Sequence, residues 1–189
     1  STRKESSAAS DVYKRQIENN AAPLGQAVAL HTEGARLMFV NCRFLGNQDT
    51  IYTGAEGARL LFTNCYIEGT TDFIFGPSTA LFEYCELHSK RDSYITAAST
   101  PQNEEFGYVF KNCKLTAAPG VKKVYLGRPW RPYAATVFIN CEFGNHIRPE
   151  GWHNWKNPEN EKTARYAEFG NTGDGAETSG RVTWGKPVS

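Results

Sequence analysis

A short sequence frame repeats five times along this chain and limits the folds that it can adopt. Each copy has phenylalanine, any residue, asparagine or tyrosine, cysteine, a polar residue and an apolar residue: FVNCRF (39–44), FTNCYI (62–67), FEYCEL (82–87), FKNCKL (110–115) and FINCEF (138–143). A period of about 20 to 50 residues indicates a solenoid. The frames alternate as strands do, and no helical periodicity competes over residues 26–145. The sequence therefore predicts an all-β parallel β-helix with a few short strands in each coil.

The five cysteines are explained by the same repeat. Equivalent residues of neighbouring coils stack at about 4.8 Å, so we expect a ladder on corresponding strands, mostly inward-pointing and unpaired. Its members are Cys42, Cys65, Cys85, Cys113 and Cys141. Neighbouring coils still allow one disulfide. No C-x-x-C motif occurs and the four histidines are scattered, so no metal site is predicted.

The composition fits one domain with few special partners. The chain has 189 residues, 40% hydrophobic, and a net charge of +1, so no strong field favours nucleic acid. No apolar run is long enough to span a bilayer, so no membrane association is predicted. Residues 1–16 are polar and lie outside the repeat, so we expect a disordered or artefactual tail and a domain over 17–189.

Six sequence blocks, in order, resemble the pectin methylesterase family over about residues 17–184. They are GQAVALH (25–31), GNQDTIYTG (46–54), GTTDFIFG (69–76), YLGRPW (125–130), HIRPEGW (146–152) and YAEFGNTGDGA (166–176). The resemblance implies a right-handed parallel β-helix and a secreted or periplasmic carbohydrate esterase, monomeric when complete and acting without a cofactor. The family's domain is longer, so we expect a partial domain that lacks N-terminal coils and the C-terminal end.

Two aspartates suggest chemistry independently of the resemblance. Asp49 and Asp72 lie 23 residues apart, about one coil, so their carboxyl groups are expected on adjacent coils. Two close carboxylates resist joint ionisation, so the pKa of one of them rises. Arg128 is the best partner for Asp72, because a guanidinium orients a carboxylate and keeps it charged. Asp72 is then the nucleophile and Asp49 the general acid. The alternative is that Asp49 is a turn residue and Asp72 a buried turn cap.

Two glutamines follow the same spacing. Gln26 and Gln48 are 22 residues apart, and stacked amides can aim N–H donors at a developing oxyanion. The alternative is an amide ladder that only satisfies backbone groups. The resemblance implies that both glutamines stabilise the oxyanion, that Asp49 is the acid/base, Asp72 the nucleophile and Arg128 the orienting arginine.

Aromatic residues are expected to form the substrate groove. The resemblance implies that Trp130 contacts the sugar, although a solvent-facing indole also commonly covers a core. The other candidates are Phe73, Phe75, Tyr52 and Tyr133. The predicted reaction is hydrolysis of the methyl esters of galacturonan. The alternatives are a non-catalytic carbohydrate-binding remnant, a β-helix polysaccharide lyase, or an esterase of another substrate.

Overall fold

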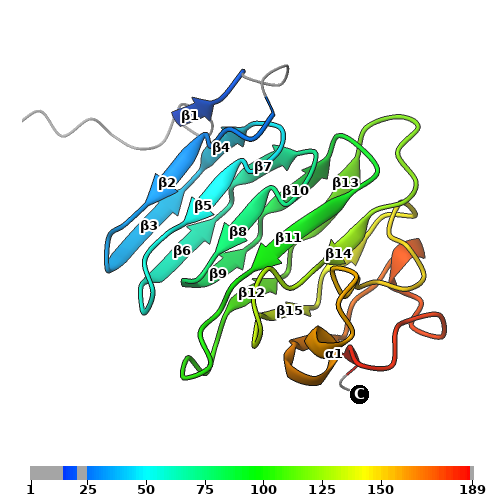
Figure 1. Cartoon of the computed structure of the whole chain (residues 1–189). Helices are drawn as coiled ribbons and strands as arrows, with labels where there is room; N and C mark the ends of the chain where they lie inside the picture. The colour runs from blue at the N-terminus through cyan, green and yellow to red at the C-terminus, as the bar shows by residue number, and fades with distance from the viewer. Residues whose placement is uncertain (1–14, 21–24, 188–189) are drawn as a thin grey trace, which may run out of the picture.

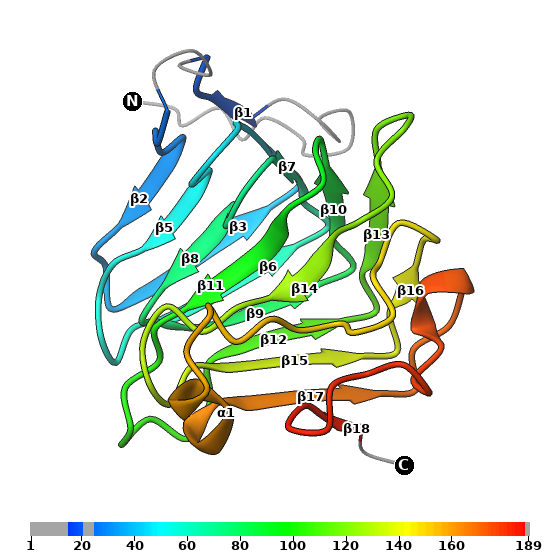
Figure 2. The same ribbon diagram turned by 45° about the vertical axis from the view of Figure 1, so that its right-hand side comes forward.

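The chain coils through three parallel sheets in the computed structural model, which describes residues 15–20 and 25–187. Figure 1 shows the strands stacked side by side along the coil, and Figure 2 shows the sheets around a common interior. Each coil contributes one strand to each of the three sheets, in the order B, C and A as these sheets are defined below. The strands of the next coil pair with it in parallel register. The predicted parallel β-helix is confirmed.

Sheet A contains β1 (Arg15–Glu18), β4 (Cys42–Leu45), β7 (Tyr66–Gly69), β10 (Glu86–Ser89), β13 (Lys114–Ala117) and β16 (Glu142–Phe143). Sheet B contains β2 (Leu30–Thr32), β5 (Ile51–Thr53), β8 (Ile74–Gly76), β11 (Tyr94–Ala98) and β14 (Tyr125–Gly127). Sheet C contains β3 (Arg36–Val40), β6 (Arg59–Thr63), β9 (Thr79–Glu83), β12 (Tyr108–Lys111), β15 (Ala135–Ile139), β17 (Arg165–Phe169) and β18 (Lys186–Pro187).

Among residues 15–20 and 25–187, helical structure is confined to short segments after the last full coil. These are α1 (Glu159–Thr163) and the 3₁₀ helix η2 (Asp174–Ala176). Within the residues that the structure describes, no helix is long and apolar enough to cross a membrane. The predicted tail falls mostly outside the described residues, as far as residue 14. Strand β1 starts at Arg15, two residues before the expected domain start, and pairs with β4.

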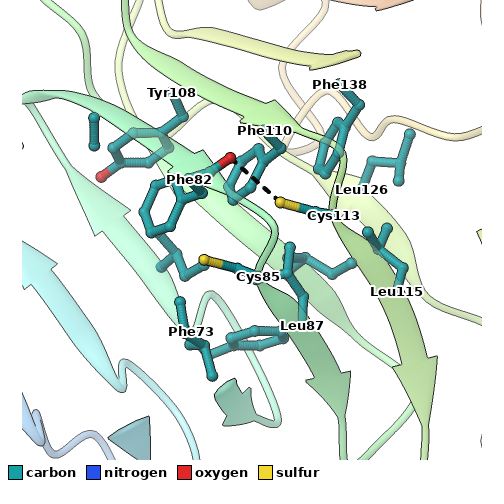
Figure 3. Close-up of a cluster of buried hydrophobic side chains, with 14 of the residues drawn as sticks. Phe73, Phe82, Cys85, Leu87, Tyr108, Phe110, Cys113, Leu115, Leu126 and Phe138 are labelled. Atoms are coloured by element: carbon teal, nitrogen blue, oxygen red, sulfur yellow. Dashed lines mark hydrogen bonds between the residues drawn. The ribbon is translucent and has the colours of Figure 1, made fainter. Parts of the chain in front are cut away.

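The repeated phenylalanines form the interior of the coil. Their rings stack in one column from coil to coil with centroids 4.5 to 4.8 Å apart: Phe39, Phe62, Phe82, Phe110 and Phe138. Figure 3 shows the thiols of Cys85 and Cys113 beside this column. The thiol of Cys113 donates a hydrogen bond to the carbonyl oxygen of Phe82 at 3.3 Å. The column explains why each frame opens on phenylalanine.

The cysteine ladder is confirmed, with one correction to its position. All five thiols are buried and free, so the disulfide that was left open is not formed. Only Cys42 lies inside a strand, whereas each of the other four comes directly before one. The residue before each cysteine has a left-handed backbone, with φ between 51° and 54°. That residue turns the chain from sheet C to sheet A, so the cysteine is the first inward-facing residue after the corner.

Tyr84 is an exception at these corners, and replacing it tests whether the left-handed backbone favours asparagine there. Four of the corners use asparagine, which tolerates left-handed φ, but Tyr84 is bulky, has φ 54° and is 57% exposed. We expect Tyr84→Asn to raise the free energy of unfolding by about 0.5–1 kcal/mol. The reverse change, Asn112→Tyr, should cost a similar amount. Chemical denaturation of both variants checks this, and a less stable Tyr84→Asn chain contradicts it.

Candidate active site

Asp49 and Asp72 occupy the same corner, between sheets A and B, on two successive coils. Ile51 of β5 pairs with Ile74 of β8, which places both aspartates two residues before the paired position. The N–H of Asp72 donates to the carbonyl of Tyr94 on the following coil at 2.8 Å. Both aspartates have left-handed backbones, with φ 66° and 48°, a conformation that aspartate tolerates better than most residues. The fold therefore places both carboxyl groups side by side.

Arg128 follows β14 and holds the carboxylate of Asp72 with both ends of its fork. Its Nε donates to Oδ1 at 3.0 Å and its Nη2 donates to Oδ2 at 2.6 Å. The side chains are 18% and 8% exposed, so water competes weakly for this pair. The predicted arginine–carboxylate contact is present. It joins residues 56 positions apart in the sequence, because β14 lies two coils beyond the corner of Asp72.

The two carboxyl groups differ in their electrostatic surroundings. Burial, and to a smaller extent the charge of Asp72, raise the pKa of Asp49 to about 6, although the charge of Arg128 opposes both effects. A raised pKa is what a general acid at Asp49 requires, and that role stays a prediction. Burial also raises the pKa of Asp72, although the hydrogen bonds and charge of Arg128 lower it. The predicted effect of Arg128, which favours the charged form of Asp72, is present, but burial has the larger effect on this pKa.

A cavity of about 140 Å³ opens above the aspartate pair. Its lining includes Gln26, Gln48, Asp49, Asp72, Phe75, Ala97, Arg128, Trp130 and Trp155. This is the volume of roughly five water molecules, enough for one ester group but not for a polymer segment.

The amides of Gln26 and Gln48 reach this cavity from successive coils. The N–H of Ala27 donates to the carbonyl of Gln48 at 3.3 Å, which ties the two segments together. Within the described residues, neither glutamine side chain has a hydrogen-bond partner. Both glutamines line the cavity, so the oxyanion role stays a prediction beside the alternative of an amide ladder.

The aromatic candidates do not all reach the cavity. Tyr52 stacks on Phe75 with ring centroids 4.7 Å apart, and Trp130 meets both rings edge-on at 6.5 and 5.8 Å. Neither Tyr52 nor Tyr133 is among the lining residues, and the carbonyl of Tyr133 accepts hydrogen bonds from Arg165.

Phe73 is fully buried, so its prediction as a groove residue is wrong. It precedes β8, directly after the left-handed corner at Asp72. The alternation of the strand does not extend back across that corner.

Sequence reasoning missed three residues at this site. Ala97 of β11 is the register partner of Phe75, so counting along the coil would have found it. Tyr94 and Trp155 lie against the guanidinium of Arg128, with ring centroids 3.9 and 3.6 Å from Cζ. Trp155 comes from a loop outside the repeat, so no periodic signal pointed to it.

Known proteins are similar to this chain in both sequence and fold. A profile of the pectinesterase family matches residues 7–187. Pectinesterase 31 of Arabidopsis thaliana is 45% identical over 172 residues, which cover 89% of this chain and 54% of that protein. Pectin methylesterase from Aspergillus niger aligns with a TM-score of 0.83 and 35% identity, covering 92% of this chain and 57% of that one.

The carrot pectin methylesterase is equally similar. It aligns with a TM-score of 0.84 and 34% identity, covering 92% of this chain and 59% of that one. The chain therefore spans a little over half the length of these relatives. The family resemblance carried by the six sequence blocks is confirmed, and the chain belongs to the pectinesterase family.

Proposed function

We propose that this chain carries the catalytic site of a pectinesterase, which hydrolyses methyl esters of galacturonan and releases methanol. One observation carries the proposal: a buried, arginine-bound aspartate faces a second carboxyl whose pKa is raised to about 6. Such a division between two similar groups is how a site obtains a nucleophile and an acid from the same side-chain type.

Asp72 is the nucleophile in this mechanism. One of its oxygens attacks the carbonyl carbon of the ester, while Arg128 holds the carboxylate in its plane and favours its charged form. The attack produces a tetrahedral oxyanion. The free amides of Gln26 and Gln48 line the same cavity and supply the N–H donors that stabilise it.

Asp49 moves the proton in both half-reactions. In its protonated form it donates the proton to the departing methoxide, so methanol leaves and an anhydride with Asp72 remains. The ionised Asp49 then takes a proton from water, which attacks the same carbonyl carbon and releases Asp72. Atoms and charges balance with water as the only co-reactant, and the product is a carboxylate on the polymer. The proposed mechanism uses no metal or organic cofactor.

The substrate polymer lies across the aromatic surface beside the cavity. Trp130, Phe75 and Tyr52 form a continuous set of rings on which pyranose faces can stack. A solved pectin methylesterase with 28% identity and a TM-score of 0.77 is described in complex with a hexasaccharide, which supports a polymeric ligand here. A substrate of this kind places the enzyme outside the cell or in the periplasm, and we propose that it acts as a monomer.

Methanol release tests the proposal. The chain is incubated with methyl-esterified pectin, and methanol, new carboxylate and the ultraviolet absorbance of unsaturated products are measured together. We expect methanol and carboxylate in equal amounts without the absorbance. Unsaturated products would identify a lyase instead. Binding of pectin without either reaction would identify a carbohydrate-binding remnant, and both outcomes contradict the esterase.

A further inference from the structure

We propose that Tyr94 and Trp155 are positioning residues that clamp the guanidinium of Arg128 in its bidentate contact with Asp72. The inference rests on the proposed function, because it assigns these rings an effect on the chemical step. It differs from a role in substrate binding, which the place of Trp155 in the cavity wall would otherwise suggest.

The distances define a sandwich. The Cζ atom of Arg128 lies 3.9 Å from the ring centroid of Tyr94 and 3.6 Å from that of Trp155. Two rings this close to one planar carbon have to occupy opposite faces of the guanidinium, because on one face they would overlap. Cation–π attraction then acts on both faces and strengthens as water is removed. The edge of the same group donates to Asp72.

The loop that carries Trp155 is built to hold it in place. Trp155 and Lys156 both have left-handed backbones, with φ 61° and 58°, a conformation that costs on the order of 1–3 kcal/mol per non-glycine residue. Asn154 offsets this cost, because its Oδ1 accepts the N–H of Lys156 at 2.8 Å and its carbonyl accepts the Nδ2 of Asn160 at 3.0 Å. Asn160 is only 7% exposed. A strained segment fixed by a buried amide indicates a required side-chain position.

Tyr94 is held from the other side and connects the clamp to the nucleophile. Its ring stacks on Tyr125 with centroids 5.2 Å apart and an interplanar angle of 11°, and His153 packs against both rings. The carbonyl of Tyr94 accepts the N–H of Asp72 at 2.8 Å. One residue therefore supports the backbone of Asp72 and the guanidinium that holds its carboxylate.

The clamp should affect the reaction rate more than substrate affinity. Without the rings, the long side chain of Arg128 can rotate away, and the carboxylate of Asp72 then loses its fixed plane. A displacement of about 1 Å at a reacting group can cost roughly 100-fold in rate. We expect Trp155→Leu to lower kcat by about 10- to 100-fold and to change KM by less than about threefold. Trp155→Phe keeps a ring over the guanidinium and should stay within about threefold of the parent kcat.

Three further variants complete the experiment. Phe106 is 57% exposed and away from the cavity, so Phe106→Leu is the matched control for loss of an exposed aromatic and should leave kcat unchanged. In an Arg128→Gln background, Trp155→Leu should cost nothing more, because its effect passes through Arg128. A rise in KM at constant kcat would overturn the clamp and make Trp155 a substrate contact.

A readout without turnover separates this inference from the proposed function. The Nε–H of Arg128 is observable by NMR, and we expect its exchange with solvent to be at least about tenfold faster in Trp155→Leu than in the parent chain. A chain that releases no methanol but shows this change would contradict the esterase and keep the clamp. Unchanged exchange in a folded Trp155→Leu chain would overturn the clamp.

Discussion

Replacing Asp72 with alanine is expected to lower methanol release from methyl-esterified pectin by about 10⁴-fold or more. The carboxylate is the only group held by both donors of the Arg128 fork within the described residues, and it faces the cavity in which the ester has to lie. An alanine offers no atom for the attack on the carbonyl carbon. The initial rate of methanol formation, normalised to folded protein, measures the loss.

A second substitution at Asp72 separates loss of the nucleophile from loss of the fold. Asp72→Ala leaves the guanidinium of Arg128 without its partner, and breaking a buried ion pair can cost about 3–5 kcal/mol. Asp72→Asn retains the shape and one acceptor oxygen, so it should fold more readily while remaining as inactive. Thermal unfolding establishes that both variants are folded. Near-normal methanol release from either folded variant would exclude Asp72 as the nucleophile.

The repeat made the aspartate pair predictable. A coil of constant design returns each corner to the same place, so residues one period apart, such as Asp49 and Asp72, have to be neighbours. The same logic would have placed Ala97 beside Phe75. Positions inside the repeat are therefore fixed by local sequence and by the stacking distance between strands.

Arg128 and Trp155 were not predictable by counting. The coils vary in length, so Arg128 was placed by its sequence block and by the need of a buried carboxylate for a partner. Trp155 belongs to a loop whose left-handed residues are set by hydrogen bonds from Asn154, and no period describes such a loop.

The balance of charge at Asp72 was also beyond the sequence. The sequence identifies Arg128 as a partner, but the pKa depends on how much water the fold removes, and here burial outweighs the arginine. Phe73 shows the same dependence on geometry. A corner residue between an aspartate and a strand can face either way, and only the direction of the turn at Asp72 decides.

Asp49→Asn is expected to lower turnover by about 10²- to 10⁴-fold, because an amide cannot donate a proton to methoxide and then accept one from water. The amide keeps the size of the side chain, so the cavity retains its shape. Asp92→Asn is the matched control: Asp92 lies outside the cavity, and its carboxylate accepts the N–H groups of Lys122 and Lys123. Methanol release by that control should be unchanged. If Asp49→Asn turned over normally, another group would have to carry the proton.

The same substitution should make the folded chain more stable above pH 6. The pKa of Asp49 is about 6 when folded, against about 3.9 for an unfolded aspartate. Between these values the folded state binds more protons, so the free energy of unfolding of the parent chain falls as the pH rises from 4 through 6.

Asparagine does not ionise, so Asp49→Asn should exceed the parent by about 2–3 kcal/mol at pH 7.5 and match it below pH 4. Denaturation at the two pH values measures the difference. The pKa of Asp92 is lowered by the N–H groups of Lys122 and Lys123, so Asp92→Asn should instead be less stable than the parent at pH 7.5. An equal stability difference between variant and parent at both pH values would mean that the pKa of Asp49 is not raised in the folded chain. A variant that gains stability while it loses turnover would show that the fold keeps the carboxyl of Asp49 in a buried site beside Asp72, at a cost in stability, because that site raises its pKa for the proton transfer.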